Sequence, residues 1–386
     1  MQPTGVLETA KTTNPLKKLL NFGQSVWLDY IRRDLLASGE LKKLIDEDGL
    51  RGMTSNPSIF EKAIGESQYY SETLKSLESR KDLDAGGRYE ILAVHDIQDA
   101  ADILRPVYDS TKRRDGYVSL EVSPHLARNT KATLEEARRL WKTVNRENVM
   151  IKVPGTAEGI PAFQQLISEG INVNVTLLFA QEVYEEVANA YVAGVEQLAG
   201  HGGDVRKIAS VASFFISRID TLVDSMVEKR LKTASNDREK ADLQSILGKV
   251  ATANGKQTYE RYQRIFSSER WKKLAAQGAQ TQRVLWASTS TKNPNYSDVM
   301  YVDELIGPDT VNTMPPATLD AFRDHGRPRA SLTEDIQGAN RVMETVARLG
   351  ISMKEVTDKL TEDGVRLFAD AFDKLMKTVE KSSKSA

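Results

Sequence analysis

One lysine and two acidic residues lie inside short apolar runs of the sequence, where charged side chains are uncommon. Lys152 is in the run VMIKVPG, Asp29 is in SVWLDYI, and Glu121 is in YVSLEV. Burial among apolar groups favours the free amine of a lysine, which can attack a carbonyl, and a neighbouring carboxyl group can then transfer protons. These residue types therefore suggest Schiff-base chemistry, in which a ketose is cleaved through an enamine.

Amides and hydroxyls occupy matching positions in other apolar runs. Side chains alternate between the two faces of a strand, so Lys152 points to the face opposite Ile151 and Val153. The same alternation turns five more polar residues toward the face of Lys152, namely Thr54, Asn56, Asn174, Thr176 and Ser213. Shared parity on several strands favours a common cavity over a structural polar layer in which Lys152 is merely ion-paired with Asp29 or Glu121.

Two cations follow the later runs. Arg218 lies three residues beyond Phe215, and Lys292 lies four residues beyond Ser288 in the segment ASTSTK. Barrels of alternating strands and helices often bind phosphate in the loops after their late strands, so a sugar phosphate would fit these cations. The alternative is that both are ordinary surface charges.

Eight short apolar runs alternate with segments of helical period. They span residues 25–31, 50–56, 117–122, 149–155, 172–179, 207–215, 283–289 and 309–315. Eight repeats of strand and helix predict a parallel sheet closed into a (β/α)8 TIM barrel, an α/β fold. In such a barrel the polar residues near the C-terminal ends of the strands share one mouth, where active sites lie.

The remaining segments predict additional helices on one barrel domain that spans residues 1–386. Residues 57–116 and 216–282 are too long for one crossover, so we expect helical insertions there. The second insertion contains EKRLKTASNDREKADLQ, a charge density typical of a solvated helical hairpin rather than of a docking surface. A C-terminal helix with apolar residues at helical spacing precedes a flexible tail at residues 381–386.

The composition excludes several classes of protein. The chain has 53 Lys and Arg against 54 Asp and Glu, a net charge of -1, four scattered His and no Cys. We therefore expect no disulfides, no thiolate nucleophile, no metal and no cofactor. Balanced charge argues against nucleic-acid binding, and no run approaches the ~18 apolar residues of a membrane span. These features predict a cytoplasmic protein without a signal peptide, as a monomer or a homodimer.

Four segments resemble a known family. They are Thr54 to Ser58 (TSNPS), Ile151 to Pro154 (IKVP), Gly170 to Phe179 (GINVNVTLLF) and Asn312 to Pro315 (NTMP). Together, and in this order, they resemble the transaldolases of the long bacterial type, class I Schiff-base enzymes, over nearly the whole chain. The resemblance implies transfer of a dihydroxyacetone unit in the pentose phosphate pathway. The donor would be sedoheptulose 7-phosphate or fructose 6-phosphate, and the acceptor glyceraldehyde 3-phosphate or erythrose 4-phosphate.

The resemblance also implies roles for individual residues. Lys152 would form the Schiff base, and Asp29 would take the proton of the C4 hydroxyl during cleavage. Glu121, helped by Thr176, would handle the water that the carbinolamine loses. The substrate would be held by the remaining candidates, which are Thr54, Asn56, Asn174, Ser213, Phe215, Arg218, Ser288 and Lys292.

One segment departs from the family pattern, and two alternatives remain. Where a second phosphate arginine is expected, the chain reads Ala-Ser-Thr-Ser-Thr-Lys-Asn, so we expect Lys292 to substitute for it, assisted by the hydroxyl of Ser288. A fructose 6-phosphate aldolase is expected to have tyrosine in place of Phe215 and glutamine in place of Glu121, so both residues favour transaldolase. A catalytically silent sugar-phosphate-binding barrel is the second alternative, with residues 216–282 as its docking surface.

Overall fold

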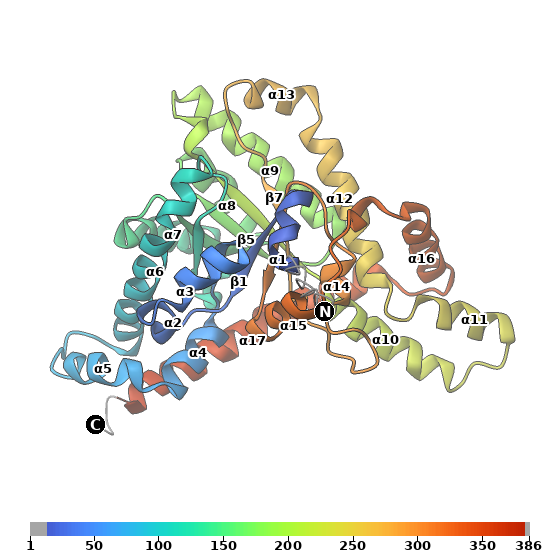
Figure 1. The fold of residues 1–386 in the computed structure, drawn as a ribbon, viewed down its shortest axis with the longest axis horizontal. Helices are drawn as coiled ribbons and strands as arrows, with labels where there is room; N and C mark the ends of the chain where they lie inside the picture. The colour runs from blue at the N-terminus through green and yellow to red at the C-terminus, as the bar shows by residue number, and fades with distance from the viewer. Residues whose placement is uncertain (1–13, 383–386) are drawn as a thin grey trace, which may run out of the picture.

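Eight parallel strands form a closed barrel in the computed structural model, which describes residues 14–382. Each strand pairs with the next along the chain, and β8 pairs with β1 to close the ring. The strands are β1 Gln24–Asp29, β2 Leu50–Thr54, β3 Tyr117–Glu121, β4 Val149–Pro154, β5 Val173–Leu178, β6 Ser210–Phe215, β7 Arg283–Ala287 and β8 Thr310–Met314. The helices surround this ring (Figure 1). The predicted TIM barrel is confirmed.

The predicted strands overran the observed ones by up to three residues, because the buried apolar runs continue into the loops. Ile31 and Phe179, for example, are buried although they lie beyond β1 and β5. Asn56 was predicted as an inward-facing strand residue, but it follows β2 and is the N-cap of α4. Its side-chain oxygen accepts a hydrogen bond from the Ile59 amide at 3.0 Å, as an N-cap residue does.

Helices fill both long segments that were expected as insertions. Residues 57–116 contain α4 Pro57–Glu66, α5 Ser71–Leu77 and α6 Ala85–Ser110, and residues 216–282 contain α10 Ser217–Leu231, α11 Asp237–Ile246, α12 Val250–Phe266 and α13 Glu269–Ala275. The antiparallel pair α10 and α11 extends away from the barrel (Figure 1), and its charged connection is largely exposed. A pair of helices therefore occupies the charge-rich stretch.

The other helices are shorter or lie on the outer ring. They are α1 Pro15–Leu19, α2 Arg33–Ala37, α3 Glu40–Lys43, α7 Thr130–Val144, α8 Gly159–Ser168, α9 Gln181–Gly200, α14 Met300–Asp303, α15 Pro316–His325, α16 Ile336–Arg348 and α17 Met353–Ser382, with single turns η1 Leu20–Phe22, η2 Leu44–Asp48, η3 Gln68–Tyr70, η4 Pro124–Leu126, η5 Val205–Lys207 and η6 Ser331–Thr333. None of the helices in the described part of the chain is long and apolar enough to cross a membrane.

Helix α17 is the predicted C-terminal helix, and it runs alongside α4 (Figure 1). Ion pairs connect it to the barrel loops on two sides. Lys374 lies 2.8 Å from Glu61 of α4, and Asp373 lies 2.7 Å from His125 after β3. Residues 381 and 382 of the predicted tail belong to α17, while 383–386 lie outside the described residues.

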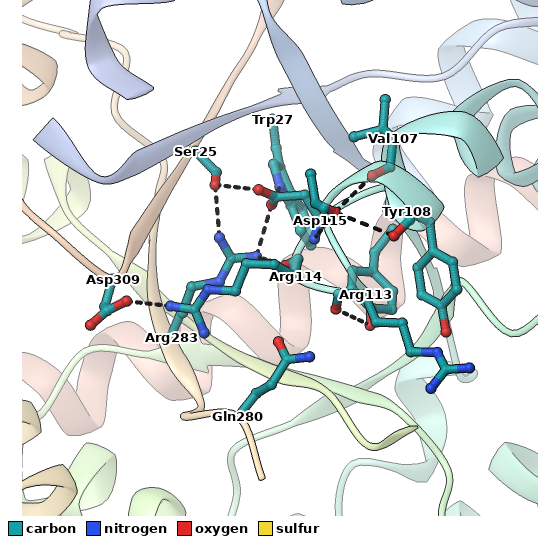
Figure 2. A network of polar contacts seen from close by, with 12 residues as sticks. Ser25, Trp27, Val107, Tyr108, Arg113, Arg114, Asp115, Gln280, Arg283 and Asp309 are labelled. Atoms are coloured by element: carbon teal, nitrogen blue, oxygen red, sulfur yellow. Dashed lines mark hydrogen bonds and ion pairs between the residues drawn. The ribbon is translucent and has the colours of Figure 1, made fainter. Parts of the chain in front are cut away.

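A buried ion pair packs the N-terminal end of the barrel (Figure 2). Arg283, the first residue of β7, lies 2.9 Å from Asp115, with side chains 4% and 7% exposed. Asp115 also accepts hydrogen bonds from Ser25 and from the indole of Trp27. Burial opposes ionisation, but Arg283 and these hydrogen bonds hold the pKa of Asp115 below its usual value. This end of the barrel is therefore closed by polar packing, opposite the predicted active-site end.

Candidate active site

A cavity of about 560 Å³ opens at the C-terminal ends of the strands. All but two of the predicted site residues line it, namely Asp29, Thr54, Asn56, Lys152, Thr176, Ser213, Phe215, Arg218, Ser288 and Lys292. The two exceptions are Glu121 and Asn174, which flank Lys152 on the neighbouring strands β3 and β5. Residues from six strands, or from the turns directly after them, therefore meet as strand parity predicts.

A larger cavity of about 880 Å³ lies between α12 and α16. Its charged side chains already have partners. Arg329 bridges Glu304 and Glu334, and Lys256 donates a hydrogen bond to the Glu334 carbonyl at 2.7 Å. It contains none of the predicted site residues, so we place the candidate active site in the smaller cavity.

Lys152 lies on the inner face of β4, and its side chain is 5% exposed. The strand register sets Lys152 beside Glu121 of β3, and its Nζ atom lies 3.3 Å from Glu121 Oε2. Nζ also donates a hydrogen bond to the Ser55 carbonyl at 3.2 Å. On another side, Nζ lies 5.5 Å from the ring centroid of Phe368, a residue of α17. The amine is thus held at the base of the cavity.

Glu121 lies beside Lys152 on the neighbouring strand β3. Burial raises the pKa of Glu121, and the neighbouring Lys152 opposes this effect. Two buried oxygens have hydrogen-bonding capacity to spare, because Glu121 Oε2 contacts only the Lys152 amine and Thr176 Oγ1 has no hydrogen-bond partner among the described residues. Their polar surfaces are therefore available to a small polar molecule or a substrate hydroxyl.

Asp29, the last residue of β1, forms a second acidic group in the cavity. It accepts a hydrogen bond from Thr54 of β2 at 2.7 Å, and the Thr54 hydroxyl lies 2.7 Å from that of Thr313 on β8. Burial raises the pKa of Asp29, while Lys152, Thr54 and Arg218 act in the opposite direction. The carboxyl group can therefore exchange a proton near neutral pH more readily than an exposed aspartate.

Asn174 points into the barrel, as parity predicts, but it is fully buried and is not among the residues that line the cavity. Its Nδ2 donates to Ser119 Oγ at 3.0 Å, and its Oδ1 accepts from Ser213 Oγ at 2.7 Å. The amide oxygen thus orients Ser213, which does line the cavity. One N–H of Asn174 takes no part in these two bonds.

Arg218 lies in the first turn of α10, where the helix N-terminus favours anions. It has no hydrogen bond or ion pair among residues 14–382, and its guanidinium carbon lies 5.2 Å from the Phe215 ring centroid. Burial lowers the pKa of Arg218, and Asp29 partly offsets this. A cavity-facing guanidinium with no fixed partner can bind phosphate in bidentate fashion.

The loop after β7 supplies a weaker cation. Lys292 is exposed, and its Nζ donates to Ser290 Oγ at 2.7 Å. Ser288 has a left-handed backbone, with φ of 56°, and its hydroxyl lies 3.0 Å from that of Ser217 at the start of α10. Both residues line the cavity, but only Lys292 carries a charge, and its exposed ammonium group is in contact with solvent.

Sequence reasoning missed several cavity residues, of which three bear on the chemistry of the site. Lys62 of α4 is an exposed cation at the cavity mouth, but nothing in a single helical lysine indicates which loop it will face. Thr313 could have been found, because it is a polar residue within the apolar run of β8. Phe368 has an apolar position on α17, and its sequence spacing indicates only that it is buried. No three His, Asp or Glu side chains within residues 14–382 are arranged to hold a metal ion.

Comparison with known proteins gives matches along almost the entire chain. The family profile described as transaldolase/fructose-6-phosphate aldolase matches residues 26–379. A transaldolase of Trichodesmium erythraeum is 48% identical over 382 residues, which cover 96% of this chain and 98% of the relative. Transaldolase 2 of Nostoc punctiforme is 47% identical over 96% of this chain and 97% of its own. A transaldolase of Thiobacillus denitrificans is 44% identical over 94% of this chain and 99% of its own.

Proposed function

The chain belongs to the transaldolase/fructose-6-phosphate aldolase family, and on that premise we propose that Lys152 is the amine through which it acts. The protein is an enzyme, a transaldolase of the pentose phosphate pathway, which transfers a dihydroxyacetone unit between a ketose phosphate and an aldose phosphate. One observation supports Lys152 over the other lysines of the cavity. Its side chain is 5% exposed and 3.3 Å from a carboxylate, whereas Lys62 and Lys292 are exposed.

Schiff-base formation is the first step that these residues would perform. The Lys152 amine attacks the C2 carbonyl of the ketose, and the resulting carbinolamine loses its hydroxyl as water. Glu121, whose pKa burial raises, is placed to protonate that hydroxyl as it leaves. The unsatisfied Thr176 hydroxyl is the group we assign to hold the departing water.

Carbon–carbon cleavage is the second step. Asp29 removes the proton of the C4 hydroxyl, the C3–C4 bond breaks, and its electrons move into the iminium to give an enamine on Lys152. The aldose phosphate leaves, and an acceptor aldehyde takes its place. Reversal of the step returns the proton from Asp29 to the new C4 oxygen. The Thr54 hydrogen bond orients the carboxylate for both directions.

Substrate hydroxyls and phosphate would be held around this centre. Thr54 and Asn56, with Ser213 oriented by Asn174, are the groups we assign to the hydroxyls of the three-carbon unit. Arg218 is assigned to the phosphate, because it is a cation on the cavity wall with no fixed partner. Lys292 and Ser288 contribute at the mouth, and Phe215 forms the apolar surface on which Arg218 rests.

The inferred donors are sedoheptulose 7-phosphate and fructose 6-phosphate, and the inferred acceptors are glyceraldehyde 3-phosphate and erythrose 4-phosphate. We further infer that the enzyme works in the cytoplasm, as a monomer or a homodimer. Retention of Phe215 and Glu121 supports transfer over simple aldolase cleavage. Comparing sedoheptulose 7-phosphate formation with release of free dihydroxyacetone tests this point, since dominant release would indicate an aldolase.

Borohydride trapping tests the role of Lys152. Incubation with fructose 6-phosphate and borohydride should reduce the iminium and leave a three-carbon unit on Lys152, which peptide mass spectrometry can locate. Lys152→Arg should lose both the label and turnover, whereas Lys62→Gln, which changes another lysine of the same cavity, should keep the label. A label on a different lysine, or none in the unaltered enzyme, would refute the assignment.

A further inference from the structure

Helix α17 brings an aromatic ring over the proposed Schiff-base lysine. Phe368 is 5% exposed and lines the cavity, and its ring centroid lies 5.5 Å from Lys152 Nζ. We propose that Phe368 is a positioning residue that holds the Lys152 side chain and excludes water from the enamine, so that transfer prevails over release of the three-carbon unit. This proposal deepens the proposed function and rests on the assignment of Lys152.

The position of Phe368 depends on a close helix contact one turn earlier. A Cβ atom at Gly364 would lie 2.9 Å from Leu177 Cδ2 and 3.8 Å from a guanidinium nitrogen of Arg218. Gly364 therefore lets α17 approach the end of β5 more closely than a larger residue would allow. Because residues four apart lie on one helix face, Gly364 and Phe368 both face the barrel mouth.

The strand under this contact is also irregular. Leu177 has a left-handed backbone, with φ of 61°, and the pairing of β5 with β6 shifts register between Val175 and Leu178. Such a bulge beside a cavity redirects side chains, and an unfavourable φ at a branched residue persists only where neighbouring structure stabilises it. Here it places Thr176 in the cavity and Leu177 against α17.

Ion pairs hold α17 to the barrel on either side of Phe368. Glu362, six residues before it, pairs with Arg128, while Asp373 and Lys374, beyond it, pair with His125 and Glu61. Each exposed pair contributes little on its own, but together they limit movement of the helix along its axis. The ring is thus a fixed part of the cavity wall.

The enamine on Lys152 has two fates that this ring can separate. In transfer, its C3 carbon attacks the acceptor aldehyde, a carbon–carbon bond forms, and the aldehyde oxygen takes a proton. In release, C3 takes a proton from water instead, giving an iminium. A water molecule then adds to C2, the C–N bond breaks, and dihydroxyacetone leaves with the lysine amine restored. Transfer ends with the same hydrolysis, because water must also add to C2 of the product iminium before the new ketose leaves Lys152. The two fates therefore differ in the protonation of C3, and an apolar ring beside Lys152 restricts the water that would protonate that carbon.

Replacing Phe368 tests the proposal through the ratio of the two fates. With fructose 6-phosphate and erythrose 4-phosphate, we measure free dihydroxyacetone released against sedoheptulose 7-phosphate formed. The ratio should rise about threefold in Phe368→Leu and about tenfold in Phe368→Ala, following the apolar cover removed. Phe372→Leu is the matched control, because Phe372 lies one turn further along α17 and packs on Tyr89 and His125 outside the cavity. It should leave the ratio unchanged.

Two further measurements keep the outcomes distinct. Borohydride labelling of Lys152 should persist in both Phe368 variants, and thermal unfolding should show that Phe368→Leu is folded. A labelled, folded Phe368→Leu enzyme with an unchanged ratio, or an equal rise in Phe372→Leu, would overturn the proposal while leaving the role of Lys152 intact. Absence of the Lys152 label in the unaltered enzyme would instead refute the proposed function.

Discussion

Asp29 and Glu121 are the two carboxyl groups of the site whose charges interact with Lys152, and their neighbours separate their roles. Glu121 Oε2 lies 3.3 Å from the Lys152 amine, so the carboxyl group is suited to proton transfer at the C2 oxygen of a substrate bound to that amine. Asp29 lies on β1 and lines the cavity, and its carboxylate is oriented by the hydrogen bond from Thr54. For both, burial raises the pKa, which brings proton exchange closer to neutral pH.

Asp29→Asn should separate Schiff-base formation from cleavage. The amide cannot accept the C4 hydroxyl proton, so we expect kcat to fall by roughly 10²- to 10⁴-fold, the usual contribution of a general base. Borohydride should still label Lys152 with the intact six-carbon substrate, since cleavage but not imine formation is blocked. Near-normal turnover in this variant would exclude Asp29 as the base.

The pH dependence of the reaction offers a finer test of the same residue. Thr54 donates to Asp29 and thereby stabilises its ionised form, so Thr54→Val should raise the pKa of Asp29 further. Because the base must be deprotonated, the acidic limb of kcat/KM should move to higher pH by about 0.5 to 1 unit, the equivalent of one hydrogen bond. Thr313→Val, which leaves the Thr54 to Asp29 bond in place, should shift it less. If the acidic limb of kcat/KM does not move in Thr54→Val, that limb reports the ionisation of a group other than Asp29.

At the scale of the elements, strand parity explains what the sequence could predict about the site. Inward residues such as Lys152 and Ser213 follow from a period of two, which is a local property. Asn56 was predicted as a strand residue because, in the sequence, a polar residue directly after a strand looks the same as an inward-facing polar residue within it. The Leu177 bulge and the packing of α17 at Gly364 depend on contacts between distant segments, and no local pattern reveals them. The position of the Phe368 ring over Lys152 could therefore be seen only in the structure.

The loops at the cavity mouth carry a prediction about phosphate binding. Arg218 is half-buried on α10 and has no fixed partner among the described residues, so it should contribute most, whereas Lys292 is exposed and bonded to Ser290. We expect Lys292→Ala to raise KM for fructose 6-phosphate about threefold with little change in kcat, and Arg218→Ala to raise it by more than about tenfold. Lys62→Ala measures how much the third cation at the cavity mouth contributes to the same KM. An unchanged KM in Lys292→Ala would remove this lysine from the phosphate site.

Across the whole molecule, the two ends of the barrel carry different polar groups for different purposes. The C-terminal end holds buried groups with open hydrogen-bonding capacity, such as Glu121 Oε2 and Thr176 Oγ1. At the N-terminal end, Asp115 is saturated by Arg283, Ser25 and Trp27 (Figure 2). Gln24 Oε1 and Gln282 Oε1 at the N-terminal end also lack a partner within residues 14–382, but they do not line the candidate cavity, whereas Thr176 does. The difference that matters is access to the cavity, which lies at the end where such barrels carry their active sites. Substitutions at the N-terminal end should therefore change stability and leave the reaction unaffected.

Arg283→Met tests this division, because it leaves the buried Asp115 carboxylate without its cation. We expect a loss of about 3 to 5 kcal/mol in unfolding free energy, with kcat of the folded enzyme unchanged. In the unaltered protein the pKa of Asp115 is lowered, so its contribution to stability is present above the unfolded pKa and is lost as pH falls through the folded value. In Arg283→Met burial should raise that pKa instead, so the destabilisation should grow as pH rises. Urea unfolding at pH 5 and pH 8, with Arg283→Met/Asp115→Leu as the partner-free control, measures the pH dependence of the variant, while the contribution of Asp115 in the unaltered protein stays constant over that range. A variant equally stable at both pH values would show that the carboxylate finds another partner.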